Sequence, residues 1–242
     1  MKRSLKRLLD FGVKAIDGEK GDVKDFLFDE EKWIIRYLKT DLETSKHGKS
    51  VLIGNVFLEK PDRDHFLFPV KLLKADIEKA PPLQEHLPVS SRYEEEYHKH
   101  YRIVNYWDLP ASAMKVMYPP RPISVPTKDI NEKDLNTNLR SYNEVANYHV
   151  HATDGVFGHV CDLIIDEDDW QIVYVIVDTS NWMPWSKKVM IPTASLAEIS
   201  YAKKEIKINL TIDQIKQSPE YNEVIAVKPD YEQSLSDFYN SL

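Results

Sequence analysis

Short apolar runs separated by acidic turns recur along this chain and predict β-strands. In the first part, the runs Val13–Ile16, Gly21–Phe28 and Trp33–Leu38 are separated by Asp17-Gly18 and by an acidic turn. An Asp-Gly pair between two such runs favours a hairpin, because glycine accepts positive φ and aspartate accepts hydrogen bonds within its own turn. The pattern therefore predicts three consecutive antiparallel strands.

The same pattern returns in the second half. Residues 3–41 align without a gap onto residues 140–178, at a constant offset of 137. A repeat of this length is too long for a solenoid unit, so each copy should hold its own core. The identical pairs are Arg3/Arg140, Ser4/Ser141, Val13/Val150, Ala15/Ala152, Asp17/Asp154, Gly18/Gly155, Gly21/Gly158, Val23/Val160, Asp25/Asp162, Asp29/Asp166, Glu30/Glu167, Trp33/Trp170, Ile35/Ile172, Tyr37/Tyr174 and Asp41/Asp178. We expect Trp33 and Trp170 to be buried at the start of equivalent third strands.

Similarity resumes at an offset of 138, where residues 48–53 match residues 186–191. Each copy then closes with two more strands and a short helical turn, which Thr211 and Gln214 cap in the second copy at capping-box spacing. Five or six short strands with tight turns indicate a small closed or partly closed β-barrel. The predicted fold is mainly β: two small β-barrels in tandem, with short helices and a proline-rich linker.

The segment between the copies contains a predicted helix and a stiff linker. Residues 89–104 favour a helix, since Tyr93, Tyr97 and Tyr101 share one face. Residues 118–126 hold four prolines in nine positions, which is typical of an extended linker. The last dozen residues suggest a loosely docked helix or a disordered tail. The predicted divisions are a first domain at 1–107, a linker at 108–134, a second domain at 135–230 and a tail at 231–242.

Composition narrows the function classes. The formal net charge of −7 opposes binding to a polyanion, so we do not expect a nucleic-acid partner. Cys161 is the single cysteine, which excludes an intramolecular disulfide and fits a reducing compartment. No apolar run approaches the roughly 18 residues of a spanning helix. The basic and leucine-rich start suits a membrane surface, but residues 140–149 have lost most of that charge, so we read the shared part as structural. We expect a cytoplasmic protein.

With both copies laid out, the chain resembles the PRC-barrel family, named for the cytoplasmic domain of the H polypeptide of the photosynthetic reaction centre. The resemblance rests on the Asp17-Gly18-x-x-Gly21 turn, on its counterpart at 154–166 and on the strands at 51–53 and 189–191. Residues 91–97, followed by Tyr106-Trp107, also look typical of tandem bacterial members. The resemblance implies compact barrels that act as binding or scaffolding modules. The reaction-centre polypeptide has a transmembrane helix and one barrel, whereas this sequence predicts two barrels and no such helix.

The turn residues are candidate structural positions rather than ligands. Carboxylates at the acidic turns are the ligand type that Ca²⁺ prefers, but they lack the ligand periodicity of a calcium loop, so we predict no metal site. The six turn residues are Asp17, Gly18, Gly21, Asp154, Gly155 and Gly158.

The sequence offers little support for catalysis. It contains no nucleophile elbow and no phosphate-cradling glycine loop, so we expect a non-enzymatic protein without a cofactor. One alternative is a metal-dependent enzyme that uses His149, His151 and nearby carboxylates, because the two histidines share one face of a strand. The other alternative, by analogy with the reaction-centre H polypeptide, is a regulator of membrane electron transport.

The candidate partner-binding residues are Trp182, Met183 and Trp185. Tryptophan and methionine are enriched at protein interfaces. The corresponding loop of the first copy reads Glu43-Thr-Ser-Lys-His47, without aromatics. A feature that folding requires should occur in both copies, so we expect the loop at 181–185 to be partly exposed and to bind a protein partner or a second copy of the chain.

Overall fold

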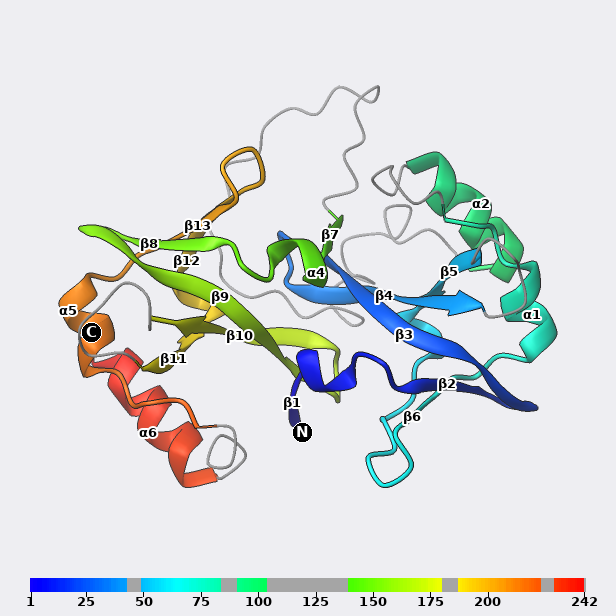
Figure 1. Ribbon diagram of the computed structural model, residues 1–242, viewed down its shortest axis with the longest axis horizontal. Helices are drawn as coiled ribbons and strands as arrows, with labels where there is room; N and C mark the ends of the chain where they lie inside the picture. Colours follow the sequence, from blue (N-terminus) through cyan, green and yellow to red (C-terminus); the bar gives the residue numbers. More distant parts are fainter. Residues whose placement is uncertain (43–48, 84–90, 104–138, 180–186, 223–228, 242) are drawn as a thin grey trace, which may run out of the picture. The chain divides into compact units, whose positions relative to one another are not determined.

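The computed structural model describes residues 1–42, 49–83, 91–103, 139–179, 187–222 and 229–241. The chain forms two compact units, both mainly β (Figure 1). We call Leu8–Ser141 the N-terminal unit. The C-terminal unit consists of Tyr142–Leu242 together with Met1–Arg7. The predicted domain and linker boundaries stay a prediction, because the residues around the linker lie outside the described ranges.

In its described residues, the N-terminal unit is a mixed sheet with two α-helices. Its strands follow the order β6-β2-β3-β4-β5, with β7 also paired to β3, and all pairs are antiparallel except β2 with β6. Among the described strands no ladder closes this path into a ring. The elements are β2 (Gly12–Ala15), β3 (Gly18–Asp29), β4 (Ile34–Leu42), β5 (Lys49–Gly54), the 3-10 turn η2 (Asn55–Phe57), β6 (Leu67–Pro69), α1 (Lys74–Lys79), α2 (Ser91–Tyr101) and β7 (Leu139–Ser141).

The C-terminal unit has the same layout. The path runs β12-β13-β8-β9-β10-β11, with β1 also paired to β9, and β13 with β8 is the parallel pair. It too is open among the described strands. The structure therefore shows a mainly β fold whose sheet is not closed, and the arrangement as two closed or partly closed barrels stays a prediction. The elements are β1 (Lys2–Ser4), α4 (Tyr142–Val145), β8 (His149–Ala152), β9 (Gly155–Asp166), β10 (Gln171–Asp178), β11 (Lys188–Pro192), η4 (Thr193–Ser195), β12 (Leu196–Ser200), β13 (Glu205–Ile208), α5 (Ile212–Gln217) and α6 (Pro229–Asn240). The turn η1 (Lys6–Leu8) lies at the junction of the units.

The strand registers of the two units are equivalent position by position. Lys14 faces Glu19 in one hairpin, and His151 faces Val156 in the other. The next pair of strands also matches, since Leu27 faces Tyr37 as Ile164 faces Tyr174. A β-bulge follows at the same place in each, where Arg36 or Val173 is the extra residue. The aligned sequences therefore fold with the same pairing and the same irregularities.

The two repeated tryptophans occupy equivalent buried positions, as predicted. Trp33 precedes β4 with 4% of its surface exposed, and Trp170 precedes β10 with 9% exposed. Both have positive φ, at 56° and 61°, which is uncommon for a bulky residue. The ring of Trp33 stacks on Phe28 at a centroid distance of 5.3 Å. Core packing therefore holds the tight turn before each third strand in an unfavourable backbone conformation.

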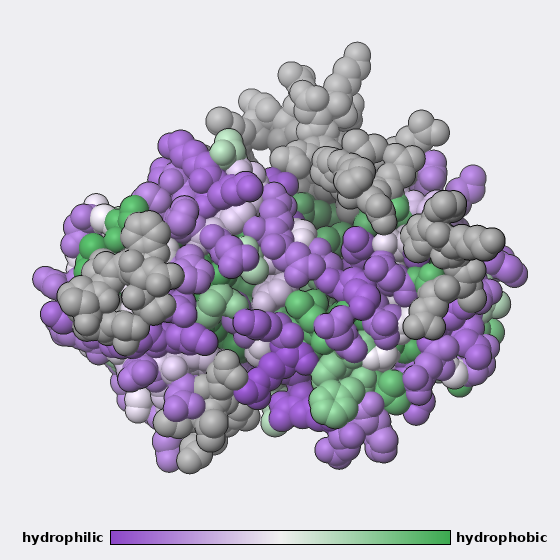
Figure 2. Space-filling view, viewed as in Figure 1, coloured by the Kyte–Doolittle hydropathy of each residue, from purple (hydrophilic) through white to green (hydrophobic). Residues whose placement is uncertain are grey.

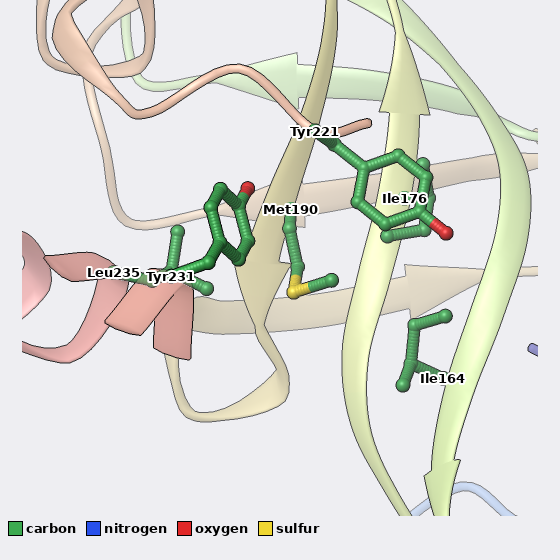
Figure 3. Close-up of a cluster of buried hydrophobic side chains, with 6 residues drawn as sticks. All are labelled: Ile164, Ile176, Met190, Tyr221, Tyr231 and Leu235. Carbon is green, nitrogen blue, oxygen red and sulfur yellow. The ribbon is translucent and has the colours of Figure 1, made fainter. Parts of the chain in front are cut away.

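A helix covers the equivalent sheet face in each unit. In the N-terminal unit, Tyr97 of α2 packs in a cluster with Leu27, Tyr37, Leu52 and Leu139. In the C-terminal unit, α6 covers a cluster of Ile164, Ile176, Met190, Tyr221, Tyr231 and Leu235 (Figure 3). The predicted tail is thus an ordered helix whose Leu235 is fully buried.

The two helices correspond at the offset of 138. Tyr93 and Tyr231 have matching roles, since the hydroxyl of Tyr93 donates to the carbonyl of Pro81 at 2.9 Å and that of Tyr231 to the carbonyl of Pro219 at 3.4 Å. These prolines are also equivalent in the repeat. The repeat therefore extends through α2 in the first copy and through α6 in the second.

The first strand of each copy pairs outside its own copy. β1 lies beside the end of β9 in the C-terminal unit, with Arg3 opposite Ile165 (Figure 1). β7 lies beside β3 in the N-terminal unit, with Arg140 opposite Phe28. Because Arg140 corresponds to Arg3 and Ile165 to Phe28, the two pairings are reciprocal and have the same register. Each unit is therefore completed by a strand from the other repeat.

Truncating either repeated tryptophan should destabilise the protein strongly. We expect Trp33→Ala and Trp170→Ala each to lower the free energy of unfolding by about 3–5 kcal/mol, since each leaves a large cavity in a packed core. The control is Ile16→Ala, at a position with 69% of its surface exposed, which should change it by less than about 0.5 kcal/mol. Urea denaturation measures all three. A tryptophan variant that loses less than about 1 kcal/mol would contradict its assignment to the core.

Candidate functional site

The predicted turn aspartates connect each hairpin to a short helix, α1 in the N-terminal unit and α5 in the C-terminal unit. Oδ1 of Asp17 accepts from the backbone N–H of Lys74 at 2.8 Å, and Oδ1 of Asp154 accepts from that of Ile212 at 2.9 Å. Both donors are first residues of a helix, α1 or α5, where backbone N–H groups lack intrahelical partners. These aspartates have structural contacts in the described structure.

The glycines of the same turns are required by close backbone approaches. A Cβ on Gly21 would lie 2.2 Å from the carbonyl oxygen of Asp41, and one on Gly158 would lie 2.4 Å from that of Asp178. Gly21 also has φ of 75°, which side chains rarely adopt. The repeated Asp-Gly-x-x-Gly spacing thus reflects strand packing.

The predicted partner-binding residues Trp182, Met183 and Trp185 lie outside the described residues. The structure does describe where their loop starts and ends. The hydroxyl of buried Thr179 donates to the carbonyl of Lys187 at 2.7 Å, and the N–H of Lys187 donates back to that hydroxyl at 3.0 Å. The loop therefore leaves the end of β10 and returns to β11 at a hydrogen-bonded pair.

The histidine pair does not gather a metal-ligand group in the described structure. His149 is exposed, and Nε2 of His151 lies 3.2 Å from Oε2 of Glu205. Within the described ranges, no three His, Cys, Asp or Glu side chains come together as a metal site. Cys161 is half-buried on β9, and burial raises the pKa of its thiol to about 12, which disfavours the reactive thiolate.

Several buried polar contacts lie where β1 docks on β9. We call Asp162 and Glu167, with the end of β9 between them, the acceptor site. Arg3 forms an ion pair with Glu167, and both side chains are largely buried. The hydroxyl of Ser4 donates to Oδ2 of Asp162 at 2.5 Å, and the N–H of Lys6 donates to its Oδ1 at 3.1 Å. An Arg-Ser dipeptide is thus recognised by two buried carboxylates.

Burial makes this recognition stringent. Asp162 is 8% exposed, and burial raises the pKa of its carboxyl, while the hydrogen bonds from Ser4 and from backbone N–H groups lower it. A buried carboxylate that lost these donors would pay its full desolvation penalty. The acceptor site therefore discriminates for a strand with the right donors at the right register.

The N-terminal unit has the equivalent site. The hydroxyl of Ser141 donates to Oδ2 of Asp25 at 2.5 Å. The guanidinium of Arg140 binds both carboxylate oxygens of Glu30, at 3.2 and 2.8 Å. This bidentate pair is more exposed than its counterpart, with side-chain exposures of 14% and 19% against 9% and 2% for Arg3 and Glu167.

A second polar cluster occurs under α2. The hydroxyl of Tyr37 donates to Oε1 of Glu94 at 2.7 Å and lies 3.4 Å from Nε2 of His98. The bulged Arg36 lies between two carboxylates, 3.9 Å from Asp29 and 4.0 Å from Glu94. All five residues are buried. Burial raises the pKa of Glu94, and the charge of Arg36 together with the Tyr37 hydrogen bond opposes that shift.

This cluster is specific to one unit. At the equivalent positions the C-terminal unit has Val173 for Arg36 and Ser236 for His98. Its counterpart of Glu94 is Glu232, which is partly exposed and pairs with Lys2 of β1 at 2.8 Å. The fold therefore does not require the buried cluster.

One segment of the chain is similar to a known protein family. Residues 138–215 match the family model described as PRC-barrel domain, which is less than half of the chain. Among curated proteins, none matches this chain. The matched segment begins at β7, the strand that pairs with β3 in the N-terminal unit. No helix in the described ranges is long and apolar enough to cross a membrane.

The sequence pattern singled out the acceptor-site residues as identical between the two repeats, but it did not predict that they contact one another. Arg3, Ser4, Asp162 and Glu167 all belong to identical pairs of the repeat. Charge complementarity within the set, one basic and one hydroxyl residue against two acids, was the available signal. The helix-face pattern of α2 also placed Tyr97 correctly, but Glu94 and His98 carry no signal of burial in the sequence.

Removing the carboxylate charge at each acceptor site should cost unequal amounts of stability. Glu167→Gln leaves the buried Arg3 without a counter-ion and should lower the free energy of unfolding by about 3–5 kcal/mol. The matched change Glu30→Gln should cost about 1–2 kcal/mol, because the Arg140 pair is more accessible to water. Parallel urea denaturation compares them. Equal losses, or a larger loss for Glu30→Gln, would contradict the assigned burial.

The buried Glu94 should make stability depend on pH. Its pKa is raised in the folded state above the ordinary 4.5, so the folded state binds the proton more tightly than the unfolded chain. Stability relative to Glu94→Gln should therefore fall as pH rises through the window above 4.5, by about 1.4 kcal/mol for each unit of pKa difference. Denaturation at pH 4 to 8 measures this. The control is Glu96→Gln, at an exposed position of α2, and a flat difference for Glu94→Gln would refute the shift.

Proposed function

We propose that this chain is a non-catalytic binding or scaffold protein, built from two PRC-barrel modules in tandem and acting by protein–protein association in the cytoplasm. The observation that carries the proposal is the PRC-barrel match over residues 138–215. The elements of that segment recur with equal register in the N-terminal unit, which supports a second module there. The PRC barrel is a small module often found in protein-interaction roles.

The polar chemistry of the described residues agrees with a structural module. The repeated aspartates Asp17 and Asp154 bind helix starts, and Asp25 and Asp162 bind the exchanged strands. These side chains are used to position backbone. A partner would then be recognised by features that differ between the two copies.

The proposed contact residues are Trp182, Met183 and Trp185. Their loop starts and ends at the Thr179–Lys187 pair, so changes in the loop need not disturb β10 or β11. Figure 2 shows a surface that is mostly hydrophilic in this view. The large apolar side chains exposed by more than 40% in the described part are Met1, Ile16, Val56, Phe66 and Leu73. Phe66 provides a matched exposed aromatic for comparison.

Replacing both loop tryptophans should weaken partner binding without unfolding the protein. A tagged chain is used to capture partners from the native cell, and the captured protein is purified and titrated against the wild type. Trp182→Ser with Trp185→Ser should raise its dissociation constant by about 30-fold or more, as expected for hot-spot aromatics worth about 2 kcal/mol. Phe66→Ser should leave it unchanged. A folded double variant that keeps full affinity would refute the proposed contact.

A further inference from the structure

The two exchanged strands bind equivalent acceptor sites through the same kinds of contact. β1 pairs with β9 through Lys2–Asp166, Arg3–Ile165 and Ser4–Ile164. β7 pairs with β3 through the equivalent positions. In both cases arginine meets a glutamate and serine meets an aspartate. Both acceptor sites therefore recognise an Arg-Ser strand by the same chemistry and the same register.

The backbone and the surrounding charge add to this recognition. The N–H of Leu5 donates to the carbonyl of Leu163 at 2.9 Å, which continues the strand addition beyond β1. Lys2 pairs with Glu232 of α6. The strand is basic and its acceptor is acidic, so the segment at residues 2–5 is held by side chains, backbone and charge together.

We propose that the acceptor site of the C-terminal unit also takes the β1 strand of a second copy of this chain, giving a strand-exchanged dimer. This deepens the proposed association function, because it names a second copy as one partner. Residues 1–7 of each chain would bind the acceptor site of the other chain and make every contact that they make there within one chain. The hydrogen bonds and ion pairs of the acceptor site form again in the exchanged dimer, so the main cost is the loss of translational freedom on association, which a higher protein concentration offsets.

The junction favours such an exchange. β1 is followed by the short turn η1 (Lys6–Leu8), and Leu8 already belongs to the N-terminal unit. Short hinge loops are a recognised setting for domain swapping between two chains. The family match also begins at β7. The first strand of the matched segment therefore pairs with β3 in the N-terminal unit, and β1 takes the equivalent place beside β9.

Disulfide trapping between two different chains tests the proposal. Lys2 and Asp166 face each other in register, and cysteines at such an antiparallel pair can form a disulfide. One protein carries Lys2→Cys and the other Asp166→Cys, both with Cys161→Ala and with tags of different size. The two are mixed, partly unfolded in urea, refolded at high concentration and oxidised. We expect a covalent heterodimer that joins the two tags.

Three controls make every outcome informative. Lys2→Cys with Asp166→Cys in a single chain should give an intrachain disulfide, which reports the register itself. Ile16→Cys, at an exposed position outside the acceptor site, measures random collision and should give about tenfold less heterodimer, since docking raises the effective concentration of the two thiols. Adding Arg3→Glu to the Lys2→Cys chain should abolish the heterodimer, because it places like charges at Glu167.

The proposal is overturned if the intrachain disulfide forms but the mixture gives no more heterodimer than the Ile16→Cys control. It is equally overturned if the intrachain disulfide itself fails, because β1 would then not dock in the stated register, or if Arg3→Glu leaves the heterodimer unchanged. None of these results depends on an outside partner. Partner capture through Trp182 and Trp185 would stand or fall separately.

Discussion

The constraint on which both units depend is the burial of carboxylates that need an exchanged strand to complete their hydrogen bonds and ion pairs. Asp162 and Glu167 lie almost entirely out of water, where an unpaired carboxylate is costly. Ser4, the backbone of Lys6 and the guanidinium of Arg3 supply their donors and counter-charge. Residues 1–7 are therefore part of the core chemistry of the C-terminal unit, and residues 139–141 have the same role in the N-terminal unit.

The sequence predicted the strands, the turns and the two buried tryptophans, because those depend on local patterns. Alternation, Asp-Gly turns and the spacing of Tyr93 and Tyr97 each report on residues near one another in the chain. It could not predict the exchange, since Arg3 and Arg140 are identical, as are Asp25 and Asp162. A strand paired within its own copy and a strand paired with the other copy then make the same contacts. The correspondence of α6 with α2 was missed because few of its residues are identical and packing selects mainly for size and apolarity.

Differences between the units separate what folding needs from what it permits. Both units close one sheet face with a helix, and in both a tyrosine hydroxyl binds an equivalent proline carbonyl. Beneath that helix the C-terminal unit packs Ile164, Ile176 and Met190, whereas the N-terminal unit also buries Arg36, Glu94 and His98. Such ionic groups are expensive to bury and add specificity more readily than stability. The same comparison singles out Trp182 and Trp185, which have no aromatic counterparts in the first copy.

The two repeats belong to one chain, and this covalent linkage changes the thermodynamics of strand exchange between them. In a pair of separate chains, each exchanged strand would be lost on dissociation. Here the chain crosses from one unit to the other at Arg7–Leu8 and at Ser141–Tyr142, so each exchange is intramolecular and its acceptor sees the strand at a high effective concentration. Opening the acceptor site removes the Ser4 and Lys6 donors from Asp162 and the counter-ion from Glu167, and it frees a basic strand at the same time. In the proposed dimer that strand completes the acceptor site of a second chain, so the contacts that stabilise each unit are the same contacts on which the proposed association depends.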